Sequence, residues 1–282
     1  MAKKFTTYPS SIHGFMEYWD DVIAQWLLKS YGSYPLSEQA SFAGDLKIPN
    51  DSIDNRMPEP YWGDPENCSV VIMNYNSGPC LDSRHTYRTC ANTPECMIHE
   101  VNKHKYSGFA KSFPLYRPLS PTELWLEDSI GRGWWQNQKT KCIADLIKGI
   151  KSDKLPFAME ICAWHSDNWP GINKTNFKKH KALIEDRVLN VLLEAVKNSD
   201  FKVGLCFGKR IGTQLLDQYV PTLFSVIKFG INYKVYCFDE DYFIVNYWDD
   251  KNSRNRYPKS ATDILKITKP SPISKPSPIS KP

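Results

Sequence analysis

Residues 69–79 read SVVIMNYNSGP, and this stretch decides the fold that we expect. Its apolar run is rich in β-branched side chains and stops abruptly, which predicts a buried strand. Asn74 and Asn76 stand at the end of the run, and Gly78 and Pro79 close a turn after them. Open α/β sheets bind ligands at such strand ends. The stretch therefore predicts either a strand-end site or a plain polar turn, since Asn, Ser, Gly and Pro are common turn formers.

The composition is that of a globular chain of one large domain or two small ones, with 282 residues and 41% hydrophobic content. The net charge is +5, of which Lys269, Lys275 and Lys281 supply three and the rest of the chain two. Charge alone is therefore weak support for a nucleic-acid partner. No apolar run is long enough to span a membrane, and the first residues lack the apolar core of a secretion signal. We expect a cytoplasmic monomer with no membrane partner, whose eight cysteines are thiols.

Strand and helix patterns alternate along most of the chain. Helical spacing of apolar residues predicts helices at 14–31, 139–151, 174–198 and from 210 onward. Short apolar runs predict strands at 69–75, 156–164, 201–209, 224–229, 232–238 and 242–248. This alternation predicts an α/β fold, a three-layer α/β/α arrangement around a central, mainly parallel sheet.

The chain divides into three parts by composition. Residues 1–56 are expected to form an N-terminal helical arm, although 33–67 is rich in Pro, Asn, Asp and Ser and favours irregular structure. Residues 57–267 form the α/β domain, within which 77–142 lacks periodicity and is expected to be an insertion-like loop region. Residues 268–282 contain the repeat SPISKPSPISKP and are expected to be disordered, since they cannot bury a core.

The first strand and its turn resemble the first motif of the uracil-DNA glycosylase superfamily, in its single-strand-selective and mismatch-specific branches. Those branches carry Gly-X-Asn-Pro-Gly after the strand, often followed by Pro. This chain has Asn-Tyr-Asn-Ser-Gly-Pro at 74–79, which agrees at Asn76, Gly78 and Pro79. In the family, the Asn at the position of Asn76 orients the attacking water. The resemblance implies a uracil-DNA glycosylase-like fold and a monofunctional, metal-independent DNA glycosylase without a cofactor.

Three later segments match the family in the same order. Where the family has a base-reading Asn-X-Cys-Pro, this chain has Glu-Ile-Cys-Ala at 160–163, so Glu160 occupies the base-reading position. The segment FKVGLCFGK at 201–209 resembles the strand that ends in Gly-Lys before a helix. The family's last loop, His-Pro-Ser, corresponds to residues 246–256, where the His is missing. That absence puts the standard uracil chemistry in doubt.

The expected site residues fall into three groups. The candidate catalytic residues are Asn76, Glu160, Asn246 and Asp249. The candidate base-binding residues are Asn74, Tyr75, Ser77, Glu160, Trp164 and Trp248. The candidate DNA-phosphate contacts are Gly78, Pro79, Lys209, Ser253, Arg254 and Arg256.

Glu160 decides the expected substrate. A carboxylate accepts a hydrogen bond from the exocyclic amine of cytosine and repels the carbonyl of uracil, unless burial keeps it protonated. Plain cytosine is not a possible target, because its excision would destroy the host genome. A modified cytosine, such as a hydroxymethylated or glucosylated base of phage DNA, therefore becomes the expected target. The alternatives are a uracil or mismatch repair glycosylase, a structural ion pair at Glu160, and a catalytically silent nucleic-acid-binding protein of the same fold.

Other clusters support different functions. Cys80, Cys90, Cys96 and His99 could hold zinc in an interaction protein, but their spacing does not match paired zinc knuckles, and no metal is expected. Cys162 and His165 would point to opposite faces of a strand, which argues against a nucleophile–base pair. The lysines of 174–181 suit either a solvated helix face or phosphate contact.

Overall fold

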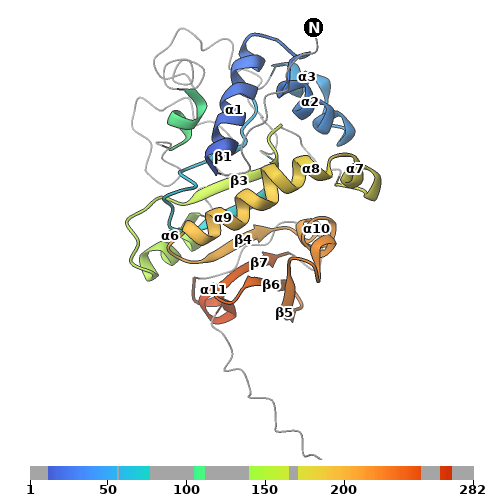
Figure 1. Cartoon of the computed structure of the whole chain (residues 1–282). Coiled ribbons are helices and arrows are strands. Elements are labelled where there is room, and N and C mark those ends of the chain that lie inside the picture. Colours follow the sequence, from blue (N-terminus) through green and yellow to red (C-terminus); the bar gives the residue numbers. More distant parts are fainter. Residues whose placement is uncertain are drawn as a thin grey trace, which may run out of the picture.

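The structure is a computed structural model that describes residues 12–55, 57–76, 105–111, 140–164, 171–248 and 261–268. Its strands form one seven-stranded sheet in the order β1-β3-β2-β4-β7-β6-β5 (Figure 1). The strands are β1 (Tyr61–Trp62), β2 (Val71–Asn76), β3 (Phe157–Cys162), β4 (Val203–Phe207), β5 (Ser225–Gly230), β6 (Tyr233–Asp239) and β7 (Tyr242–Tyr247).

Helices flank the sheet and occupy one end of the molecule (Figure 1). Three of them precede the sheet: α1 (Ile12–Leu27), α2 (Leu36–Asp45) and α3 (Asn50–Asn55). Later helices are α6 (Thr140–Gly149), α7 (Lys174–Lys179), α8 (Lys181–Ile184), α9 (Asn190–Asn198), α10 (Lys209–Gln214) and α11 (Ala261–Thr268), besides the helical residues 105–111. A π-helical turn, η3 (Glu185–Leu189), joins α8 to α9, and a 3-10 turn, η4 (Leu216–Tyr219), follows α10.

The centre of the sheet is parallel and its two sides are antiparallel. Strands β3, β2, β4 and β7 all run in the same direction. Strand β1 pairs antiparallel with β3, and β5, β6 and β7 form antiparallel pairs. Only residues 231–232 and 240–241 connect the last three strands, and connections that short require antiparallel pairing. The expectation of a mainly parallel sheet is thus correct for the centre and wrong for the sides.

The two faces of the sheet pack against different helices, which gives the expected layered α/β arrangement. On one face, Val71 and Met73 of β2 join a large core with residues of α1, α2 and α9. On the other face, Val70 and Ile72 pack with α6 and α11. Successive strand residues alternate between the faces, so residue parity along a strand tells which core its side chain joins.

Three expectations about local structure need correction. Residues 33–67 are not irregular, because α2 and α3 lie there and bury Leu36 and Phe42 against the core. The helix expected at 174–198 is interrupted at His180 and by η3. Residues 105–111, inside the expected loop region, are helical and bury Tyr106 and Ala110. The rest of 77–142, apart from α6, and the repeat after residue 268 lie outside the described residues.

Along the described part of the chain, no helix is long and apolar enough to cross a membrane.

Candidate functional site

The connections of the parallel strands diverge between β2 and β4. After β2 the chain continues to β3 on one side, whereas after β4 it continues through β5 and β6 to β7 on the other. Ligands of open α/β sheets bind outside the carboxyl ends of the strands at such a switch point. The segment 74–76 ends β2, and Lys209 follows β4 after Gly208, so the topology brings the predicted residues Asn74, Asn76 and Lys209 to the same edge of the sheet.

Asn74 and Glu160 form a side-chain pair at this edge. They are direct partners in the parallel register of β2 and β3, and Asn74 Nδ2 donates to Glu160 Oε1 at 3.1 Å. Asn74 is buried and Glu160 is half-buried. Both share the face of Ile72 and Ala158, toward α6 and α11. The amide therefore fixes the carboxylate that the sequence predicts to read a base.

The side chain of Tyr75 points to the other face of the sheet from Asn74, and it links β2 to α10. Its hydroxyl accepts a hydrogen bond from the backbone N–H of Ile211 at 3.0 Å. Burial raises the pKa of the phenol, although hydrogen bonds from the backbone of Ile211 and Arg210 lower it in part. With only 8% of its surface exposed, Tyr75 is a structural residue here and does not present the ring that was expected to bind a base.

The turn from β4 into α10 presents two cations. Gly208 has a φ of 115°, which a residue with a side chain rarely adopts, and its N–H donates to the carbonyl of Tyr247 at 2.6 Å. This fixed turn exposes Lys209, as the sequence predicted, and also Arg210, which the sequence analysis did not single out. The run Gly-Lys-Arg at a strand end is the signal that could have identified Arg210.

Two predicted base-stacking tryptophans are core residues. Trp164 is fully buried, and its Nε1 has no hydrogen-bond partner within the residues that the structure describes. Trp248 is 7% exposed and packs against the ring of Phe229 at 6.3 Å between centroids. Neither ring offers an open stacking surface in this structure, because packing covers its faces.

Asn246 lies away from the Asn74–Glu160 pair. It is fully buried on β7, on the face that packs under α10, where a Cβ on Gly212 would come within 2.7 Å of its Nδ2. Its amide atoms have no hydrogen-bond partner among the described residues. The structure does not bring Asn246 to Glu160: Asn246 pairs in register with Cys206 on the face of the larger core, whereas Glu160 pairs with Asn74 on the other face.

Several predicted residues cannot be placed. Asn76 is the last residue of β2 and pairs in register with Cys162, but its side chain is outside the described part of the structure. The other predicted residues outside it are Ser77, Gly78, Pro79, Asp249, Ser253, Arg254 and Arg256. The possible zinc ligands Cys80, Cys90, Cys96 and His99 are outside it as well, as is His165.

Two observations on the described side chains concern a metal site and a cysteine nucleophile. No group of three or more His, Cys, Asp or Glu residues gathers closely enough to hold a metal ion in the described ranges. Cys162 is fully buried, and burial raises the pKa of its thiol to about 12. A thiol with that pKa is protonated at neutral pH and is a weak nucleophile.

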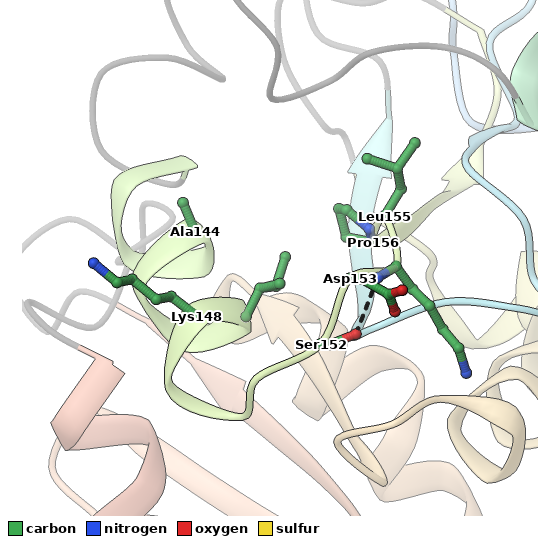
Figure 2. Close-up of a pocket in the computed structure, with 8 residues that line it drawn as sticks. Ala144, Lys148, Ser152, Asp153, Leu155 and Pro156 are labelled. Atoms are coloured by element: carbon green, nitrogen blue, oxygen red, sulfur yellow. Dashed lines mark hydrogen bonds between the residues drawn. The ribbon is translucent and has the colours of Figure 1, made fainter.

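A hollow of about 340 Å³ lies on another part of the molecule, between α6 and the segment that leads into β3 (Figure 2). Its lining includes Lys148 and Asp153, and the Ser152 hydroxyl accepts a hydrogen bond from the N–H of Lys154 at 3.2 Å. The hollow is at the amino end of β3, whereas the candidate residues lie at the carboxyl ends. It is therefore separate from the candidate site and supplies control positions for its tests.

No protein-family model matches the chain, and searches of the curated proteins and of the solved structures found no match either.

Proposed function

We propose that this chain is a DNA glycosylase of the uracil-DNA glycosylase superfamily that excises a modified cytosine and leaves an abasic site. The observation that carries the proposal is the hydrogen bond between Asn74 and Glu160. It fixes a carboxylate near the carboxyl ends of the parallel strands, beside the point where the strand connections diverge. A fixed carboxylate is an acceptor suited to the exocyclic amine of cytosine.

The proposed reaction needs a bound water, a base pocket and contacts to the DNA backbone. Water adds to the sugar carbon as the bond to the base breaks, and charge develops on both the sugar and the departing base. The base must leave the helix to reach such a site. Asn76 is our candidate for orienting the water, as the resemblance implies. Glu160 would read the base, and Lys209 with Arg210 would contact phosphates.

A nucleic-acid-binding protein without catalytic activity is the second candidate. The observation in its favour is that Tyr75 and Trp164 are buried and that Asn246 points away from Glu160. These residues were expected to complete the base pocket and the chemistry. Such a protein would use the same strand ends for binding and release no base.

Base release from a panel of DNAs tests the proposal. The panel contains uracil, 5-methylcytosine, 5-hydroxymethylcytosine and glucosylated hydroxymethylcytosine, and free base and abasic sites are measured by mass spectrometry. We expect release of a cytosine derivative. Release of uracil alone would support glycosylase activity but refute the proposed reading of a cytosine base by Glu160. Binding of all DNAs without release of any base would favour the second candidate.

Three variants assign the activity to the site. Asn76→Ala should slow base release by at least tenfold with little loss of DNA binding. Glu160→Gln keeps an acceptor for the Asn74 amide but replaces one acceptor oxygen by a donor, so it should shift preference toward uracil. Lys148→Ala, in the hollow at the opposite edge of the sheet, is the control and should leave release unchanged. Unchanged preference in Glu160→Gln would refute base reading by that residue.

A further inference from the structure

Helix α7 and the residues just before it contact the end of α10 and the turn η4 that follows it. The N–H of Ile172, just before α7, donates to Gln214 Oε1 at the end of α10 at 3.0 Å. The ring of Phe177 in α7 packs against Tyr219 of η4, with centroids 5.8 Å apart. Figure 1 shows α7 and α10 on the same side of the molecule. Cations on these two helices therefore belong to one surface.

This surface is strongly basic. We define the α7–α10 basic surface by its four exposed cations, Lys174, Lys178, Lys209 and Arg210. The neighbouring Lys179 and Lys181 are ion-paired with Asp45 and Glu185. By contrast, none of Lys174, Lys178 and Lys209 forms an ion pair with a carboxylate of the described residues. The surface thus keeps at least three cations that the fold does not neutralise there.

The stability of α7 does not explain Lys174, nor the spacing of Lys174 and Lys178. Lys174 and Lys178 are four residues apart, and like charges at that spacing destabilise a helix. Lys174 also stands in the first turn, where a cation opposes the helix dipole. Another residue starts the helix, since the Asn173 side chain accepts a hydrogen bond from the N–H of Asn176 at 2.8 Å. A polyanionic partner accounts for these charges better than the fold does.

We propose that the α7–α10 basic surface binds the phosphate backbone of DNA beside the candidate site, an inference that rests on the proposed function. The surface lies at the carboxyl end of β4, next to β2 in the sheet, because α10 directly follows β4. Lysines in such a place neutralise phosphates and release counterions, whatever the DNA sequence. An anionic membrane is the poorer fit. A helix that lies on lipid needs an apolar face, and the one large apolar residue of α7, Phe177, packs against Tyr219.

The salt dependence of DNA binding tests this proposal with the full chain. The test variant is Lys174→Gln with Lys178→Gln, and the control, with the same charge change, is Lys148→Gln with Lys151→Gln at the end of α6. Affinity is measured for a fluorescent duplex without any modified base, from low to moderate salt. Each lost phosphate contact lowers the steepness of log K against log salt by about 0.9. We expect the test variant to lose about 1.8 in this slope and up to about 60-fold in affinity at 0.1 M salt.

The outcomes separate this proposal from the proposed function. Equal slopes for the test variant and the control would overturn the proposal, even if the chain releases a base. A reduced slope in the test variant alone would support it, even if no base is released. Binding of wild-type protein to vesicles that contain phosphatidylserine, with no measurable affinity for DNA, would overturn it in favour of a membrane. Thermal melting checks that both double variants are folded.

Discussion

The side chain of Asn74 donates a hydrogen bond of 3.1 Å to Glu160 Oε1 across two neighbouring parallel strands. The pair is polar, yet it lies between strands whose other residues form the two apolar cores. Replacing such residues by apolar ones of similar shape often costs nothing in stability, so a buried polar pair is not explained by stability alone. A role for the pair in holding the carboxylate for a ligand is consistent with its place at the strand ends.

The first prediction concerns the donor of this pair. Asn74→Ala should lower the free energy of unfolding by about 1–3 kcal/mol, because the Glu160 carboxylate loses a hydrogen bond from a buried donor. Asn74→Asp should cost more at pH 7, where two neighbouring carboxylates repel, and less at pH 4, where one of them takes up a proton. Urea unfolding of both variants and wild type at the two pH values measures this. If the Asp and Ala variants lose equal stability at both pH values, the contact does not exist in solution.

A second prediction concerns the hydrogen bond that links Tyr75 of β2 to Ile211 of α10. Tyr75→Phe keeps the ring but removes one of two acceptors of the Ile211 N–H, which also donates to the Gly208 carbonyl at 3.2 Å. The loss should therefore be that of one buried hydrogen bond, about 1 kcal/mol. Tyr31→Phe is the control, because its hydroxyl bond to the Asp54 carbonyl, at 3.2 Å, is exposed to water. The free energy of unfolding should fall clearly only in Tyr75→Phe. A loss of similar size in both variants would show that the hydroxyl at Tyr75 has no special role.

The sequence predicts local elements better than their relative placement. The strands around residues 157–162 and 203–207 follow from short apolar runs, and each is confirmed within a few residues. The pairing of Asn74 with Glu160 was missed, because it depends on the order and register of strands far apart in the chain. The sequence did contain a signal for this pairing. Asn74 stands two residues before the end of β2, and Glu160 stands two residues before the end of β3.

The errors at the candidate site have physical causes as well. A tryptophan beside a strand end suits a stacking platform and a core equally well, and only the packing shows that Trp164 is core. Asn246 and Glu160 both precede strand ends, but which face a side chain joins depends on parity within the strand. The face can be assigned from the sequence only when the pairing register of the strands is known. Hence a residue type at a strand end predicts the edge of the sheet and not the face.

A third prediction uses the close approach of α10 to β7. A Cβ on Gly212 would lie 2.7 Å from Asn246 Nδ2 and 2.9 Å from the Tyr236 hydroxyl, so in Gly212→Ala the helix or these buried side chains must shift. We expect a loss of about 1–3 kcal/mol in the free energy of unfolding. Gly44→Ala in α2 is the control, because its Cβ would meet nothing within 4 Å and Ala favours a helix by about 0.5–1 kcal/mol. Thermal melting should therefore move in opposite directions for the two variants.

The last prediction concerns the anchor that holds α7 in place beside α2. Asp45 Oδ2 lies 2.5 Å from Lys179 Nζ and 2.6 Å from His180 Nε2, and the Asp45 carbonyl accepts from Asn176 Nδ2 at 2.8 Å. Hydrogen bonds from Lys179 and His180 lower the pKa of the Asp45 carboxyl. A lowered pKa in the folded state means that this contribution to stability is complete above the unfolded value of about 4, and is lost as the pH falls through the folded value.

Asp45→Asn should therefore destabilise the protein at pH 7 and approach wild-type stability at the lowest pH at which both still fold. Asp153→Asn is the control, since Asp153 is exposed and should keep a constant difference from wild type. Urea unfolding from pH 7 downward measures both.

Asp45 also orients α7, so Asp45→Asn should weaken DNA binding. Since Lys174 and Lys178 themselves remain, this loss should be smaller than the loss caused by replacing those two lysines. A larger loss of binding in Asp45→Asn would mean that helix position, and not lysine charge, controls the α7–α10 basic surface.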